Sequence, residues 1–130
     1  MTISFIATDK ATAPFSNYSQ AVQIPPGARI VQVSGQVSMS PSGKLPSDPE
    51  QQNELAWRNV FAILDAANMD KNDITDVTAY VIHHEHVPTY RDVRDRMLEG
   101  AKPASTLLIA GLADPDWLVE IAVTAAKVDF

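Results

Sequence analysis

A single carboxylate stands in an apolar segment near the C-terminus. Glu120 lies within Trp117 to Ile121, which otherwise has the pattern of a buried strand. An unpaired buried carboxylate is very costly, so such a residue either reaches an exposed edge or serves a function. Glu120 is therefore the first candidate for acid/base chemistry. Two hydroxyls, Ser105 and Thr106, begin the strand that we expect to pair with this segment.

Tyr18 and the pair Ser34-Gly35 could also contact a ligand. Tyr18 lies between a loop and a strand, where it could close over a bound molecule, although a tyrosine packed on the surface is the more frequent explanation. Gly35 interrupts a strand, and a glycine there marks either a bulge or a close approach of ligand or backbone. The spacing alone does not decide between these explanations.

The three histidines lie together in His83-His84-Glu85-His86, at the expected end of a strand. In extended chain His84 and His86 point the same way, as two metal ligands should, but no third ligand follows at a recognisable spacing. A nucleophile triad built on Ser105 is disfavoured as well, because the chain has no G-x-S-x-G pattern. The sequence predicts no metal site.

A charged segment carries arginines at positions 91, 94 and 96, with Asp92 and Asp95 between them. Most such helix faces are solvated, and their ion pairs contribute about a few tenths of a kcal/mol each. A minority bind an anionic ligand, because a guanidinium matches the two oxygens of a carboxylate. Both explanations stay open for Arg91 and Arg94.

The composition is that of one soluble domain spanning residues 1–130, with 45% hydrophobic and 20% charged residues. The formal net charge of −6 disfavours a nucleic-acid partner, because phosphate binding needs a basic face. The absence of cysteine excludes disulfides and thiolate chemistry, and it is compatible with a reducing compartment. The N-terminus has no signal-peptide pattern, and no segment reaches the roughly 18 apolar residues of a membrane span. We expect a cytoplasmic protein without a membrane partner.

Strand patterns at both ends of the chain flank two helices. Asp48 and Pro49 form a strong helix start, with an aspartate N-cap before a proline at the first helical position. A second helix is expected from near Pro88 to Gly100. Turn signals predict one hairpin across residues 25–27 and another across residues 114–116. The expected strands are Ile3–Ala7, Ala21–Ile24, Arg29–Met39, Val77–Ile82, Thr106–Leu112 and Trp117–Val128.

This order of elements predicts an α+β fold, in which two helices cover one face of a single mixed β-sheet. The opposite face of that sheet still carries apolar residues and needs cover. Self-association would supply the cover, so we expect an oligomer.

Six motifs follow one another along the chain: Asn17 to Ala21, Val33 to Gln36, Gln51 with Asn59, Val77 to Val81, Pro103 to Thr106, and Val119 to Ile121. This ordered set resembles the Rid family (reactive intermediate deaminase, also called YjgF or RidA) over nearly the whole chain. The resemblance implies a chorismate-mutase-like fold, a homotrimer and ligand clefts between subunits. It also implies hydrolysis of enamine or imine intermediates to a keto acid and ammonia, without a cofactor or metal.

The resemblance also implies a role for each candidate residue. Tyr18 would line the cleft, Ser34-Gly35 would form its floor, and Glu120 would orient a water and relay a proton. Ser105 and Thr106 would supply hydrogen bonds to an imine-like or carbonyl metabolite.

The chain departs from the family pattern at Ser105, where deaminating members carry an arginine that grips the substrate carboxylate. A serine supplies neither the positive charge nor the two parallel N–H donors of a guanidinium. The lost contact corresponds to about 2–4 kcal/mol of binding free energy. Three outcomes stay open: a different, neutral substrate; compensation by Arg91, Arg94 or Lys102; or loss of catalysis.

The predicted function is an imine deaminase of altered specificity. The alternative is a non-catalytic ligand-binding or chaperone-like module on the same scaffold. Ribonuclease activity, attached to some relatives, is disfavoured by the acidic charge balance and by the lack of a histidine pair near the cleft motifs.

Overall fold

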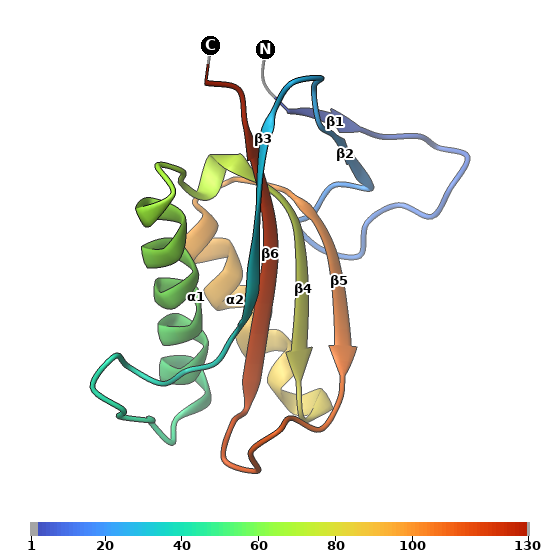
Figure 1. Ribbon diagram of the computed structural model, residues 1–130. Coiled ribbons are helices and arrows are strands. Elements are labelled where there is room, and N and C mark those ends of the chain that lie inside the picture. The colour runs from blue at the N-terminus through green and yellow to red at the C-terminus, as the bar shows by residue number, and fades with distance from the viewer. Residues whose placement is uncertain (1–2, 130) are drawn as a thin grey trace.

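Two helices pack on one face of a four-stranded sheet (Figure 1). The structure, a computed structural model, describes residues 3–129. The helices are α1 (Pro49–Ala66) and α2 (Val87–Leu98), and two short 3₁₀ turns span Lys71–Asp73 and His84–His86. The strands are β1 (Ser4–Ile6), β2 (Ala21–Gln23), β3 (Arg29–Gln36), β4 (Ile74–Val81), β5 (Ala104–Ile109) and β6 (Val119–Lys127). The predicted α+β class with a two-helix layer is confirmed.

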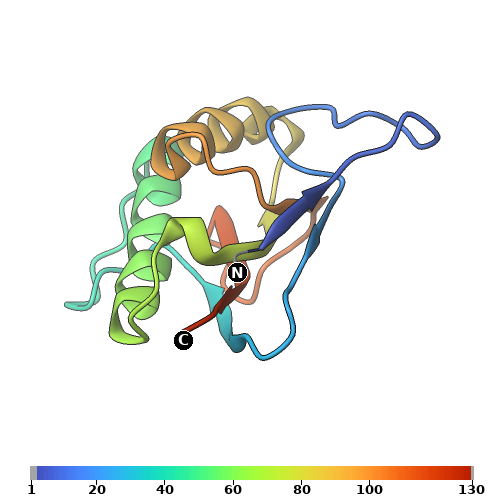
Figure 2. The ribbon, with the colours of Figure 1, turned by 90° about the horizontal axis from the view of Figure 1, so that it is seen from above.

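The main sheet has the strand order β3-β6-β4-β5 and is mixed. β6 is antiparallel to both of its neighbours, β3 and β4, whereas β5 runs parallel to β4. β1 and β2 form a separate two-stranded sheet that stands beside the main one (Figures 1 and 2). The expectation of a single sheet is therefore wrong in this respect.

The predicted hairpin across residues 25–27 is wrong. The turn itself forms, because the amide of Ala28 donates to the carbonyl of Pro25 at 3.3 Å. However, β2 pairs with β1 and β3 pairs with β6, so the chain changes sheets at this turn. Two consecutive prolines supply no N–H donors, which leaves the connection unable to continue a ladder between β2 and β3.

The predicted hairpin across residues 114–116 is also wrong. β4 lies between β5 and β6, and the connection between those two strands passes around the end of β4. Backbone hydrogen bonds fasten this connection to β4: Ala110 N–H donates to the carbonyl of Val81, and Ile82 N–H donates to that of Leu118. β4 and β6 have no exposed residue, and their central places give each of them a partner strand on both sides.

α1 begins where the sequence predicts. The Asp48 carboxylate accepts from the amide of Gln51 at 3.0 Å, and Pro49 occupies the first turn. The buried side of α1 includes a polar side chain, Gln52, which donates to the carbonyls of Pro46 and Asp116. These bonds hold two loops against the start of the helix. The apolar residues of the same side are Ala56, Trp57, Val60 and Leu64.

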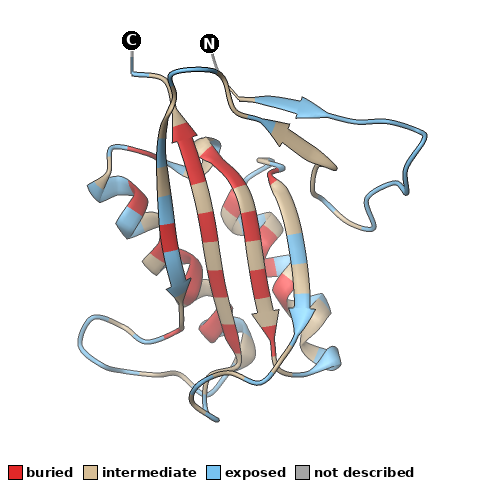
Figure 3. Cartoon of the chain, turned by 45° about the vertical axis from the view of Figure 1, so that its right-hand side comes forward, coloured by how far each residue is buried: buried red, intermediate tan, exposed pale blue. Residues whose placement is uncertain are grey.

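The core lies between the sheet and the helices. On β4, the alternate residues Val77, Ala79 and Val81 are fully buried, as the sequence predicts. From α2, Tyr90 and Val93 enter the same core. Alternating buried and partly buried bands along β4 and β6 show this two-sided pattern (Figure 3).

The sheet face turned away from the helices is open to solvent in the single chain. It carries apolar side chains among polar ones, including Ile30, 55% exposed, and Leu108, 42% exposed. Self-association over this face remains a prediction. Among residues 3–129, no helix has the length and apolar character that crossing a membrane requires.

Candidate functional site

Glu120 lies on the open face of the sheet, in its central strand β6. Its neighbours Val119 and Ile121 are fully buried on the helix side, so the side chain between them points to the opposite face. Its Cα partner on β4 is Tyr80. None of the ion pairs formed within residues 3–129 includes Glu120. A partly buried carboxylate without a cation beside it is available to a ligand.

Gly35 makes room for the Glu120 side chain. The register of β3 against β6 shifts between Val33 and Gln36, which places Gly35 in a bulge. A Cβ at position 35 would lie 2.8 Å from Cδ of Glu120 and 2.9 Å from its Cγ. Of the two alternatives that the sequence left open at Gly35, the register shift supports the bulge, and the atoms that approach the glycine are those of the Glu120 side chain.

The open face around Glu120 is called the carboxylate face below. Gly35, Tyr80 and Glu120 form its centre. Thr106 belongs to the same face, because it pairs with Thr78, two residues before Tyr80 on β4. Ser34 is exposed beside Gly35, on the side of β3 opposite the buried Val33.

Ser105 lies on the other side of the sheet. Its Cα partner on β4 is Val77, which faces the helices, and Ser105 lines a cavity together with residues of α2. Within one chain Ser105 therefore does not face Glu120, contrary to the expectation that the two share a strand pair. The reason is the parity of a β-strand, since neighbours along a strand point to opposite faces.

The helix-side cavity has a volume of about 350 Å³. Tyr18 lies in its wall, and the Tyr18 hydroxyl accepts from the amide of Phe15 at 3.2 Å. The cavity thus brings together the loop before β2, the helix α2 and the edge strand β5. Its lining residues are Phe15, Ser16, Tyr18, His84, Val87, Arg91, Arg94, Ser105, Leu107 and Ile109.

The loop wall of this cavity is held by an ion pair on α2. Arg94 Nε donates to Asp95 Oδ1 at 3.0 Å, and Arg94 Nη2 donates to the hydroxyl of Ser16 at 3.3 Å. The second carboxylate oxygen of Asp95 accepts from Asn17 Nδ2 at 2.9 Å. These contacts join residues 78 positions apart, and no local sequence pattern predicts such contacts. Sequence reasoning therefore missed Ser16 and Asp95.

Arg94 is a structural cation rather than a solvated one. Its side chain is 4% exposed, and its guanidinium lies 5.8 Å from the centre of the Tyr90 ring. The Tyr90 hydroxyl is buried without a hydrogen-bond partner among the described residues. Burial, the largest cause, raises the pKa of Tyr90, and the nearby Arg94 opposes that shift.

Arg91 differs from Arg94 in having no such partners. Its Nε is buried and has no hydrogen-bond acceptor, and no carboxylate within residues 3–129 forms an ion pair with it. Residues 87, 91 and 94 recur at helical spacing, which places Arg91 on the side of α2 that faces the cavity. This guanidinium is consequently the cation of the cavity that is not already paired.

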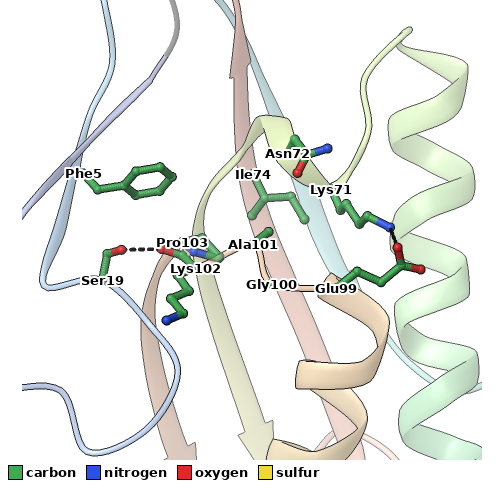
Figure 4. Close-up of a pocket in the computed structure, with 10 residues that line it drawn as sticks. All are labelled: Phe5, Ser19, Lys71, Asn72, Ile74, Glu99, Gly100, Ala101, Lys102 and Pro103. Carbon is green, nitrogen blue, oxygen red and sulfur yellow. Dashed lines mark hydrogen bonds and ion pairs between the residues drawn. The ribbon is translucent and has the colours of Figure 1, made fainter.

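Lys102 lies in a different cavity, of about 610 Å³, at the end of α2 (Figure 4). There Ser19 donates its hydroxyl to the backbone carbonyl of Lys102 at 2.5 Å, and Lys71 pairs with Glu99 at 2.8 Å. Phe5 and Ile74 form the apolar part of the wall. Apart from Lys102, none of the site residues that the sequence predicts lines this larger cavity.

The histidine cluster does not have the extended geometry assumed from the sequence. His84–His86 forms a 3₁₀ turn, so the two histidines do not project together as they would along a strand. The rings of His83 and His86 lie 5.1 Å apart, edge to face. Within the residues that the structure describes, no group of three His, Cys, Asp or Glu side chains is placed to hold a metal ion.

Comparison with known proteins places the chain in a family. The family described as Endoribonuclease L-PSP matches residues 8–127, nearly the whole chain. A mouse protein named 2-iminobutanoate/2-iminopropanoate deaminase is 31% identical over 127 residues, which cover 96% of this chain and 92% of the mouse protein. The chain belongs to the Rid family. Rat and mite proteins of the same name are also similar, at 29% and 28% identity over 127 and 110 residues.

Solved structures of Rid proteins have the same fold. The Rid protein YyfB of Yersinia pestis superposes with a TM-score of 0.85 at 27% identity, covering 98% of this chain and 100% of the other. TdcF of E. coli, solved with bound serine, superposes with a TM-score of 0.73 at 26% identity, covering 96% and 99%. The two-helix layer on a mixed sheet is therefore that of the Rid fold.

Proposed function

We propose that this Rid protein hydrolyses reactive imines or enamines, with Glu120 as the acid/base residue. The observation that supports the proposal most is the position of Glu120. Its carboxylate is held on the open sheet face by a glycine bulge and is committed to no cation in the described chain. Such a group can accept a proton from water and return it to a leaving amine.

The proposed reaction needs one water and one proton relay. Water adds its oxygen to the electrophilic imine carbon while Glu120 takes a proton from that water. The carboxylic acid so formed donates this proton to the nitrogen, which gives a carbinolamine. Glu120 then takes the hydroxyl proton of the carbinolamine and passes it to the amine as the C–N bond breaks, which releases ammonia and leaves a carbonyl. In this reaction the protein positions the water and relays the proton.

The proposed site includes two copies of the chain. Tyr18 and Ser105 line the helix-side cavity, whereas Glu120, Gly35 and Thr106 belong to the opposite face. A β-sheet separates these groups within one chain, so a single molecule of substrate can meet both only where a second copy supplies one of them. The homotrimer that the family resemblance implies would provide this arrangement.

Two relatives support the chemical class of the substrate. The mouse relative is named for the deamination of 2-iminobutanoate and 2-iminopropanoate, and TdcF binds serine. Each of these molecules is small and carries a carboxylate. The helix-side cavity, at about 350 Å³, lies at the small end of the range for ligand sites.

The proposal is tested by generating imino acids in place with an amino-acid oxidase and following their decay. The wild-type protein should accelerate the decay, and Glu120→Gln should lower that rate by about 10²–10⁴-fold, as expected for loss of an acid/base group. Asp76→Asn is the matched control, because Asp76 is a carboxylate on β4, the strand beside Glu120. Equal rates for the wild type and Glu120→Gln would contradict the acid/base role.

The substitution at Ser105 motivates a second candidate, a binding module without catalysis. In that case imine decay would match the rate without protein, while a small carboxylate would still raise the melting temperature. The same samples therefore separate the two candidate functions.

A further inference from the structure

We infer that Arg91 is the carboxylate-binding residue of the helix-side cavity and selects anionic ligands for this protein. This inference deepens the proposed function, since it assigns the ligand class of the same site to a residue of α2. It rests on three features of the cavity: an unpaired guanidinium, a competing cation that is already engaged, and a lining that combines hydroxyl and aliphatic groups.

The first feature is the unsatisfied guanidinium of Arg91. Its Nε is removed from solvent and has no acceptor, and no carboxylate of residues 3–129 lies within ion-pair distance. A buried charged donor without an acceptor costs free energy. An anion that enters the cavity would supply the missing acceptor. Its binding would therefore remove the free-energy cost of the unsatisfied donor.

The second feature is that the other cations near the site are engaged elsewhere. Arg94 already donates to Asp95 and Ser16 and packs on the Tyr90 ring. Lys102 lines the separate cavity at the end of α2. Of the three cationic side chains that the sequence left as alternatives, Arg91 alone both lines the cavity and lacks a partner.

The third feature is the chemistry of the remaining wall. Tyr18 and Ser105 bring hydroxyl groups to the cavity, and Leu107 and Ile109 bring aliphatic surface from the same edge strand. The one acidic residue bonded within this region, Asp95, has its oxygens occupied by Arg94 and Asn17. The cavity is thus locally positive in a chain of net charge −6. A small carboxylate with a short alkyl group matches this combination of a cation, hydroxyl groups and aliphatic surface.

The test compares two ligands that differ only in charge: pyruvate, and its neutral amide pyruvamide. Binding of each is measured by calorimetry for the wild type, Arg91→Gln and Lys102→Gln. Each variant loses one positive charge, so Lys102→Gln controls for net charge. Arg91→Gln should weaken pyruvate binding by about 10- to 100-fold, as expected for a charge-assisted hydrogen bond, and should leave pyruvamide binding within about twofold.

A second variant tests the position of the charge. Ser105 lines the same cavity as Arg91, so a guanidinium carried at position 105 would enter the same space. Adding Ser105→Arg to Arg91→Gln should therefore restore the preference for pyruvate over pyruvamide. Circular dichroism spectra and melting curves would show that each variant is folded.

The possible results separate this inference from the proposed function. If Arg91→Gln and Lys102→Gln bind pyruvate equally well, Arg91 does not carry the specificity, even when imine hydrolysis is intact. Suppose that the wild-type protein hydrolyses no imine, but that it binds pyruvate and only the Arg91→Gln variant loses this binding. In that case the inference stands and the proposed reaction fails. Equal loss of pyruvate and pyruvamide binding would mean that Arg91 shapes the cavity without recognising charge, which overturns the inference.

Discussion

The helix-side cavity and the carboxylate face are built in opposite ways. The cavity joins three parts of the chain that are distant in sequence, and a partly buried ion pair on α2 bonds to the loop that carries Ser16 and Asn17. The carboxylate face needs only adjacent strands and one glycine, because β3, β6 and β4 present their side chains in fixed register. The cavity is positively charged and concave, whereas the face carries a carboxylate that no described cation neutralises.

This difference means that neither region is a complete site for imine hydrolysis. The cavity can bind an anion but has no available carboxylate among the described residues that line it, since the nearby Asp95 is bonded to Arg94 and Asn17. The face has the carboxylate but no cation. The two half-sites lie on opposite sides of one sheet, so the comparison predicts that they act together only across copies of the chain.

Mixing two defective variants gives the largest expected effect. Glu120→Gln lacks the acid/base group and Arg91→Gln lacks the anion-binding group, so each protein alone should be poorly active below saturation. After the two are unfolded and refolded together, about a quarter of sites would combine an intact Glu120 with an intact Arg91, if these residues come from neighbouring copies. Imine decay in the mixture is compared with the sum of the separate samples. No gain over that sum would show that each copy works alone.

Substitution of Gly35 tests whether the carboxylate face depends on close packing. In Gly35→Ala the new methyl group would overlap the end of the Glu120 side chain and displace the carboxylate. Because a small displacement of a catalytic group is costly, turnover should fall by about 10- to 100-fold. The fold should survive, since the displaced atoms belong to a flexible side chain. Gly111→Ala is the control, because nothing lies within 4 Å of the added atom there. Unchanged turnover in Gly35→Ala would argue against a fixed carboxylate position.

The sequence predicted the local features of both regions but not how they combine. The cap of Asp48 and the buried alternation along β4 follow from patterns within a few residues, and the bulge at Gly35 was one of two alternatives that such a pattern left open. Each depends on backbone geometry that neighbouring residue types determine. Such features can be read from the chain without knowledge of its tertiary structure.

The errors arose where pairing depends on distant segments. Two turn signals were interpreted as hairpins, yet β2 pairs with β1, and β4 separates β5 from β6. The second error also placed Ser105 opposite Glu120, although the parallel pairing with β4 turns Ser105 toward the helices. A turn signal shows where the chain reverses or bends, and it does not say which strand becomes the neighbour.

Removal of Asp95 sharpens the contrast in how the two regions are stabilised. Asp95→Ala leaves the buried Arg94 with only the Ser16 hydroxyl and frees Asn17. Because Asp95 is partly exposed, we expect a loss of about 1–2 kcal/mol in the free energy of unfolding, measured with urea.

Asp92→Ala, an exposed change on the same helix, is the control and should alter stability by about 0.5 kcal/mol or less. Glu120→Gln should behave like that control, since Glu120 forms no ion pair within residues 3–129. Equal losses in Asp95→Ala and Asp92→Ala would contradict the anchoring role of the ion pair.

The smallest effect is expected beneath the cavity, at Tyr90. Its hydroxyl is buried without a partner, so Tyr90→Phe removes an unpaired polar group while keeping the ring under Arg94. At neutral pH the variant should be as stable as the wild type, or more stable by about 1 kcal/mol.

The same pair of proteins should differ in how stability depends on pH. Burial raises the pKa of Tyr90 in the folded state, so the tyrosine of the unfolded chain ionises first, near the ordinary tyrosine pKa of about 10. Above that pH the wild type should lose stability relative to Tyr90→Phe, and the gap should widen until the folded phenol also ionises. Urea unfolding of both proteins between pH 7 and alkaline pH measures the gap, and a gap that stays constant would show that this hydroxyl is satisfied in solution.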